Sequence, residues 1–432
     1  MISKTKRRTA ALILAFAMVL VFLPTVTLPA SAFSPPTEQA VTDSLPHGSG
    51  KFYLTKDVTI DQEWDLTGQE VVLDLNGFGI RFVGNQGRVI SINYGQLTIK
   101  DSNPDNRTHK YTVDENGLAT VNDELTGIEG VDYFTFSGGY LTGGNEPTMG
   151  GGVLIHSHGT FLMEGGTIIG NHGNIGGGIA VESGSFTMNG GSILYNTTGE
   201  GGGVDVWKGT IAINGGLIQG NSAELGGGIF LGLDSVLDMT GGSVLGNVAY
   251  QGGGIYVKNA SLRLEGAPTI TDNKESGEDS NVYLYSDSAV ITVTGALENP
   301  TPVGVRRRND VGVFTSGLSG KGNAERFSAD DSRFTVGITE DGEAQLFANV
   351  IVNPPAEPEL DPPAEPAGDD SPEIEPVAED PSEQATNEET PAPRSGKGGI
   401  IALSVGLGVT FAGAGVAGGI VFYRKKKNAG NQ

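Results

Sequence analysis

Two carboxylates and three aromatic residues occupy the positions of this sequence that are best suited to chemistry. Glu182 and Asp205 lie in equivalent segments of neighbouring sequence repeats, which places them one coil and two residues apart on one strand face. Strand geometry then separates their Cα atoms by about 8 Å, a spacing compatible with a general acid and a general base acting on one glycosidic bond. Trp207, Phe230 and Tyr256 fall on the same face, where grouped exposed rings typically mark a contact surface.

Both patterns also have a purely structural explanation. Two carboxylates on adjacent coils of an acidic chain reach such a separation by chance, and sequence shows neither a pocket nor a shifted pKa. The rings are equally compatible with a covering loop or with plain solvation. The sequence therefore favours ligand binding by the aromatic residues over catalysis by the two carboxylates, and it indicates no cofactor. His156 and His158 lack a third ligand nearby, so no metal site is predicted.

The composition narrows the classes of function further. The chain of 432 residues contains 68 glycines and no cysteine, and its formal net charge is -24. The missing cysteines exclude a disulfide framework, a thiolate metal site and a cysteine nucleophile. Nucleic acid is not expected as a partner, because phosphate binding requires clustered Lys and Arg. The basic run at 306–308 is expected to form a solvated turn or to pair with the acidic segment that follows it.

A tandem repeat of about 25 residues is expected to position these side chains. Three sequence markers recur in phase through five repeats, which a chance pattern does not do. The markers are Gly-Gly-Gly at 150–152, 176–178, 201–203, 226–228 and 252–254, Gly-Gly starting at 165, 190, 215 and 241 and weakened to Gly-Ala at 266–267, and Asn171, Asn196, Asn221, Asn247 and Asn273. A fixed period of this kind predicts a solenoid of stacked units.

Each repeat contains three short segments with alternating apolar residues, as at 204–206, 211–213 and 217–219. A segment of this length is not stable alone, so each is expected to pair with its equivalent in the next repeat, about 4.8 Å away. Three strands and three turns per repeat predict an all-β parallel β-helix. Apolar columns should fill its interior: Ile155, Val181, Val206, Leu231 and Val257 in one, and Met163, Met188, Ile213, Met239 and Leu264 in another.

Glycine and asparagine have defined places in this geometry. Tight corners repeated in every coil favour glycine, which adopts left-handed backbone at no steric cost. The five aligned asparagines are expected to form a ladder of side-chain amides that hydrogen-bond from coil to coil.

The repeats between about 138 and 273 resemble those of right-handed parallel β-helix surface proteins. The Gly-Gly-x-Ile element together with Ile-x-x-Asn is also similar to the repeats of bacterial polymorphic outer-membrane and adhesin-like proteins. The resemblance implies a right-handed all-β solenoid that contacts a surface ligand. Known β-helix enzymes instead cleave acidic polysaccharides with charged clusters on an outward sheet face, often with calcium.

The repeat divides the middle of the chain into three parts. Irregular first coils are expected over 33–137, with a polar loop excursion at 102–133 that breaks the period. The regular repeats follow at 138–280. Terminal coils and a cap at 281–353 should close the solenoid, because an uncapped last coil would expose unpaired strand edges.

The two ends of the chain indicate export to a cell surface. A basic start, an apolar run and small residues before residue 33 are typical of a secretory signal peptide at 1–32. Residues 354–398 are rich in Pro and in acidic side chains and should form a disordered, extended stalk. The uncharged stretch at 399–423 is long enough for a transmembrane helix, and the basic residues at 424–432 should remain cytoplasmic.

The order of stalk, span and basic tail resembles the sorting signal of Gram-positive proteins that a sortase attaches to the cell wall. In that family a Leu-Pro-x-Thr-Gly motif precedes the span. The equivalent place here reads Ala392, Pro393, Arg394, Ser395 and Gly396, so that Pro and Gly match while Ala replaces Leu and Ser replaces Thr. The resemblance implies a sortase as a partner and wall attachment, with permanent retention in the membrane as the alternative.

These patterns together predict an extracellular β-helix on a stalk, acting as an adhesin-like or glycan-contacting module. Its expected partner is a polysaccharide or a host surface ligand. A polysaccharide lyase or glycoside hydrolase on the same fold is an alternative, and a purely structural surface spacer is another.

Overall fold

The computed structural model of the protein describes residues 38–125, 132–319 and 324–349. The predicted signal peptide, stalk, sorting motif, membrane span and basic tail lie outside these residues. Within them the single helix is η1 (Ala324–Arg326), and no helix is both long and apolar enough to cross a membrane.

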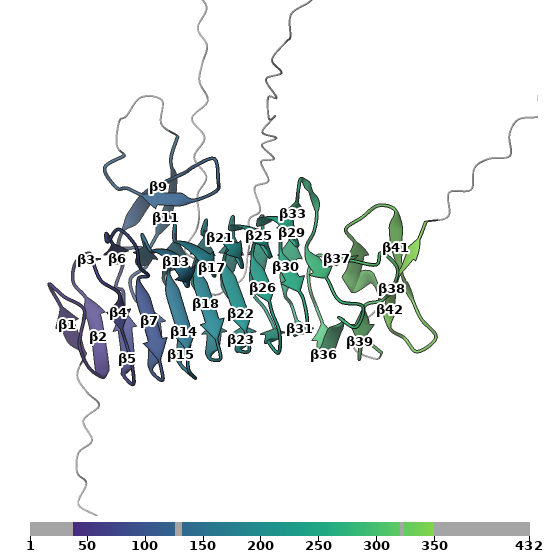
Figure 1. The fold of residues 1–432 in the computed structure, drawn as a ribbon, viewed down its shortest axis with the longest axis horizontal. Coiled ribbons are helices and arrows are strands. Elements are labelled where there is room, and N and C mark those ends of the chain that lie inside the picture. The colour runs from purple at the N-terminus through teal and green to yellow at the C-terminus, as the bar shows by residue number, and fades with distance from the viewer. Residues whose placement is uncertain (1–37, 126–131, 320–323, 350–432) are drawn as a thin grey trace, which may run out of the picture. The chain divides into compact units, whose positions relative to one another are not determined.

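The described chain winds into a parallel β-solenoid, which confirms the predicted all-β stacked architecture (Figure 1). Segments one repeat apart pair in parallel, as Ile211 does with Phe186 and with Leu237. Sheet A runs along the whole solenoid in the order β1 (Gln39–Val41), β2 (Gly50–Leu54), β5 (Glu70–Asp74), β8 (Gln96–Lys100), β15 (Thr160–Met163), β19 (Ser185–Met188), β23 (Thr210–Ile213), β27 (Val236–Met239), β31 (Ser261–Gly266), β36 (Ile291–Leu297) and β39 (Thr315–Ser316).

Two further parallel sheets form the other predicted faces of the coil. Sheet B contains β3 (Val58–Ile60), β6 (Gly79–Phe82), β12 (Tyr140–Thr142), β16 (Thr167–Ile169), β20 (Ser192–Leu194), β24 (Leu217–Gln219), β28 (Ser243–Leu245) and β32 (Thr269–Thr271). Sheet C contains β4 (Trp64–Asp65), β7 (Ile90–Asn93), β14 (Val153–His156), β18 (Ile179–Glu182), β22 (Val204–Trp207), β26 (Ile229–Leu231), β30 (Ile255–Val257), β35 (Val282–Leu284), β37 (Val303–Arg307) and β40 (Phe327–Ala329).

Each central coil also contains a fourth strand, so the expectation of three strands per coil is wrong. Sheet D contains β13 (Asn145–Met149), β17 (His172–Ile175), β21 (Thr197–Glu200), β25 (Ser222–Leu225), β29 (Val248–Gln251), β33 (Lys274–Glu275) and β34 (Glu278–Asp279). These segments are only partly buried and show no apolar alternation, as the Ser-Ala-Glu-Leu sequence of β25 illustrates. The hydrophobic pattern therefore could not predict them.

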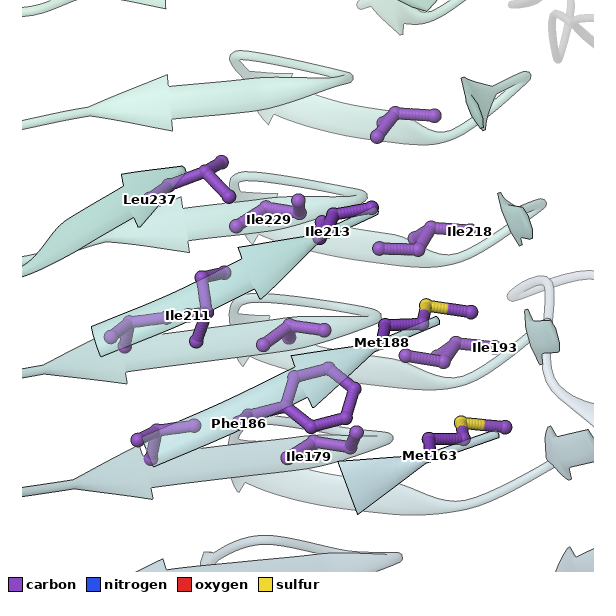
Figure 2. Packing of buried hydrophobic residues seen from close by; sticks show 14 of the residues in the cluster. Met163, Ile179, Phe186, Met188, Ile193, Ile211, Ile213, Ile218, Ile229 and Leu237 are labelled. Carbon is purple, nitrogen blue, oxygen red and sulfur yellow. The ribbon is translucent and has the colours of Figure 1, made fainter. Parts of the chain in front are cut away.

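The interior of the coil confirms both predicted apolar columns. The column that starts at Ile155 is fully buried, and every member of the column that starts at Met163 is at most 1% exposed. Figure 2 shows Met163, Met188 and Ile213 following one another from coil to coil. Burial of each such side chain contributes about 1.5–3 kcal/mol, which offsets the entropy cost of ordering very short strands.

The predicted asparagine ladder is also confirmed. The Oδ1 atom of Asn196 accepts the backbone N–H and the Nδ2–H of Asn171, at 2.9 and 3.1 Å. The same two bonds join each later rung to the next, and the fully buried rungs are Asn171, Asn196, Asn221, Asn247 and Asn273.

The ladder continues beyond the repeat and ends at a carboxylate. Asn273 donates to Asn281, and Asn281 donates its N–H and its Nδ2–H to the two carboxylate oxygens of Asp330, at 2.6 and 2.7 Å. Burial raises the pKa of Asp330 to about 6, although the two bonds from Asn281 oppose this rise. Gly304 leaves room for the carboxylate, since a Cβ there would overlap Asp330 Oδ1.

The excursion at 102–133 is more than the loop that the sequence predicted. Its strands β9 (Thr108–Val113) and β10 (Ala119–Val121) join β11 (Phe134–Ser137) in an antiparallel sheet, which stands to one side of the solenoid in Figure 1. Tyr111 and Phe136 of this sheet pack against Tyr140 and Leu194 of sheet B. The excursion is therefore attached to the solenoid wall by a separate apolar cluster.

The terminal coils end in a second antiparallel sheet, in the segment where the sequence predicts a cap. It contains β38 (Gly312–Val313), β42 (Ala344–Ala348) and β41 (Phe334–Ile338). The expectation of a solvated turn at 306–308 is wrong for its first two residues, which belong to β37. Arg307 is buried and donates to the carbonyl oxygens of Asp287 and Val313.

Candidate functional site

A column of outward positions follows the ends of the strands on the outer side of sheet C, and every position except Gly232 carries a polar or aromatic side chain. Strand register aligns its first four members, and the backbone N–H groups of the later members continue the same pairing beyond the strand ends. We name this column the outer stripe. It consists of Asn93, His156, Glu182, Trp207, Gly232, Lys258, Tyr285 and Arg308.

Trp207 is the central aromatic side chain of the outer stripe and is partly exposed. Its ring lies over Gly232, where an added Cβ would come within 2.7 Å of Cε3. Towards the end of the stripe the Arg308 guanidinium lies 4.5 Å from the centre of the Tyr285 ring. The stripe thus presents ring faces and hydrogen-bonding groups at successive coil positions, about 4.8 Å apart.

The structure corrects the expectation of an exposed aromatic face, because Phe230 and Tyr256 are buried at 0% and 2% exposure. Their rings stack at 5.3 Å, and Tyr283 and Leu225 pack against them in a cluster separate from the main core. Both residues do point away from the coil interior, as predicted. The unpredicted fourth strand covers them, since Leu225 ends β25. Of the three predicted ligand-binding residues, Trp207 alone retains exposed surface.

The two carboxylates are neighbours, as predicted, but they differ in access. Asp205 pairs with Ala180, two residues before the exposed Glu182. Asp205 is 1% exposed, and neither of its carboxylate oxygens has a hydrogen-bond partner among the described residues. Burial raises the pKa of Asp205 well above its usual value, the charge of Glu200 adds to this rise, and Lys258 opposes it. Burial therefore disfavours the charged form of Asp205, and solvent does not reach its carboxyl group.

The structure places His156 and His158 in different surroundings. His156 lies on the outer stripe with Nε2 3.4 Å from Ser91 Oγ, while His158 follows it in the adjoining turn. In the ranges that the structure describes, no three His, Asp or Glu side chains converge as metal ligands do.

The structure also contains a cleft that the sequence did not predict. A cleft of about 770 Å³ lies between the hairpin of the excursion and the strands of sheet D. Its side chains come from segments far apart in the chain, including Glu115, His172 and Glu224. The one sequence signal for this cleft is the interruption of the repeat at 102–133. The interruption indicates an insertion, but it does not show which sheet of the solenoid the insertion faces.

Comparison with models of known protein families, with curated proteins and with solved structures gives no match. The likeness to β-helix surface proteins rests on the repeat pattern and on the coil geometry alone.

Proposed function

We propose that the protein is a secreted, surface-displayed β-solenoid whose outer stripe binds a linear glycan. The observation that carries the proposal is the regular spacing of the stripe, one backbone position per coil at about 4.8 Å, which is comparable with the length of one sugar unit in an extended polysaccharide. Trp207 offers its partly exposed ring to the apolar side of a pyranose. Glu182 and Lys258 supply an acceptor and a donor for its hydroxyl groups.

Replacement of Trp207 by alanine tests this proposal. We expect glycans retained on a saccharide array to bind the Trp207→Ala protein roughly tenfold more weakly, because the stacking surface is lost. Tyr250→Ala is the matched control, since Tyr250 is 70% exposed on β29 of sheet D, away from the stripe. Equal loss in both variants, or no loss in Trp207→Ala, would contradict a role for the stripe. Product release that disappears in Glu182→Gln would establish polysaccharide cleavage instead.

We further propose that the solenoid is right-handed and is displayed on the cell surface through the stalk and the sorting-like motif. Connections between parallel strands of one sheet are right-handed in about 98% of cases, which supports the winding. The signal-like residues 1–32 and the positive tail at 424–432 support export with a cytoplasmic C-terminus.

Fractionation of cells tests the mode of attachment. We expect cell-wall hydrolases to release a product that ends near Ser395, and we expect Pro393→Ala to prevent that release because it alters the one motif position with restricted backbone. Extraction by detergent alone, with a product that retains residues 399–423, would show permanent membrane anchoring.

A further inference from the structure

Two cationic side chains of the outer stripe have no partner for their charge. Within the residues that the structure describes, Lys258 and Arg308 form neither an ion pair nor a side-chain hydrogen bond. Each lies against an aromatic ring instead. Lys258 Nζ is 5.8 Å from the centre of the Phe230 ring, and Arg308 Cζ is 4.5 Å from the centre of the Tyr285 ring.

Most other cationic side chains of the described chain are paired, as Arg306 is with Glu275 at 3.6 Å. The exposed Lys208, which follows Trp207 in the sequence, lacks an ion pair like the two stripe residues. Among the described residues, the remaining Lys or Arg without an ion pair or side-chain hydrogen bond is Lys51 of sheet A. In a protein of formal net charge -24, unpaired cations therefore gather along the outer side of sheet C.

The acidic side chains beside the stripe do not cancel these charges. Asp205 is 1% exposed, and burial raises its pKa well above its usual value even though Lys258 opposes the rise. Burial thus disfavours the carboxylate that would neutralise Lys258. Asp287 accepts a hydrogen bond from Asn309 and forms no ion pair with Arg308. Both cations of the stripe therefore remain available to an anionic ligand.

The unpaired cations recur at every second coil. Backbone hydrogen bonds between successive coils place Tyr285 midway between Lys258 and Arg308. In the same way, Gly232 separates Lys258 from the coil that carries Lys208. Two coil steps amount to about 9.6 Å, which is comparable with the length of one disaccharide unit in an extended polysaccharide.

We propose that the outer stripe binds a linear polyanionic glycan in which every second sugar carries a carboxylate. This inference rests on the proposed function, because it names the class of glycan that the stripe takes. The carboxylates face Lys208, Lys258 and Arg308, and the uncharged sugars lie opposite the coils between them. Lys258 then pairs with a carboxylate rather than with a hydroxyl group. The exposed Glu182 limits the anionic segment at the other end of the stripe, since it repels a carboxylate.

Calorimetric titration of the protein with hyaluronan decasaccharides tests the inference, because every second sugar of this probe is a uronate and the others are uncharged. We expect the carboxyl-reduced decasaccharide to bind at least about tenfold more weakly. An oligogalacturonate of the same length has a carboxylate on every sugar. We expect it to bind about fivefold more weakly than hyaluronan, because half of its charges meet no cation.

Substitution of the two stripe cations tests the residues. Lys258→Gln and Arg308→Gln should each weaken hyaluronan binding about fivefold, and the double variant should weaken it further. Lys51→Gln is the matched control, because it removes an equally unpaired cation from sheet A and should leave the binding unchanged. All three side chains are at least partly exposed, so the variants should retain the fold.

Three results would overturn the inference. They are equal binding of hyaluronan and its carboxyl-reduced form, equal binding of hyaluronan and oligogalacturonate, and hyaluronan binding that is unchanged in the double variant. If a neutral glycan on the saccharide array is lost in Trp207→Ala while one of these results holds, the proposed function stands and the charged ligand is refuted. Failure of every glycan to bind, charged or neutral, would refute both.

Discussion

Replacement of Asn221 by alanine is expected to lower the free energy of unfolding by about 4 kcal/mol. Asn221 Oδ1 accepts two bonds from Asn196, and its Nδ2 donates to the carbonyl oxygen of Ile193 and to Asn247. The substitution leaves the two N–H groups of Asn196 and the carbonyl of Ile193 without partners at a fully buried position. Each orphaned group of this kind costs about 1–3 kcal/mol.

Urea denaturation of the variant measures this loss, and hydrogen exchange locates it at the Asn196 amide. Asn214→Ala is the matched control from the same coil. Asn214 also bonds to an asparagine one coil away, with Nδ2 2.9 Å from Asn189 Oδ1, but this pair is exposed to solvent. The control should lose less than about 1 kcal/mol, because water replaces the missing bond. Equal losses in the two variants would show that the ladder has no special energetic role.

Replacement of Asp330 by asparagine is expected to stabilise the protein at neutral pH, on the order of 2 kcal/mol. The pKa of Asp330 is raised from 3.8 to about 6, so the native state takes up a proton that the unfolded chain still lacks as the pH falls from 6 to 4. The stability of this group is therefore fully present below the unfolded pKa and is lost as the pH rises through 6. An asparagine avoids that loss, since its Oδ1 accepts both N–H groups of Asn281 as every earlier rung does.

The pH dependence of thermal unfolding checks the sign. The stability gained by Asp330→Asn should vanish near pH 4, at about the unfolded pKa. The gain in stability that the buried Asp205 contributes as the pH falls should remain in both proteins. Asp331→Asn is the opposing control, because a hydrogen bond from Arg333 lowers the pKa of Asp331 to about 2 and favours its charged form. A variant Asp330→Asn that is less stable than the parent protein at neutral pH would refute the argument.

The fold was predictable where the period of the sequence reports directly on packing. The columns that start at Ile155 and Met163 were correct because every coil repeats the same inward position. Asn281 and Asp330 were not predictable as rungs, since Asn281 follows Asn273 by only eight residues across the β33–β34 hairpin and Asp330 returns from a distant coil. Register can be read from a repeat, but not where the repeat is interrupted.

The candidate site was predictable in alignment but not in exposure. Strand alternation correctly placed Trp207, Phe230 and Tyr256 away from the coil interior. It could not show that Leu225 of a polar fourth strand covers the two buried rings, because outward orientation is not the same as contact with water. The cleft could not be predicted either. It forms between an inserted hairpin and sheet D, and the repeat pattern does not show which sheet the insertion packs against.

The asparagine ladder also gives the solenoid a chemical polarity. Between rungs, the backbone N–H and one Nδ2–H always donate to the asparagine on the C-terminal side. The Oδ1 of the first rung therefore accepts the N–H of Gly144, and the last rung, Asn281, donates two N–H groups to Asp330. Each middle rung accepts two hydrogen bonds from the rung before it and donates two hydrogen bonds to the rung after it. Internal coils are therefore interchangeable units, so the length of the rod can change by whole coils in evolution. The two ends are not interchangeable, because only the C-terminal one must supply an acceptor such as a carboxylate.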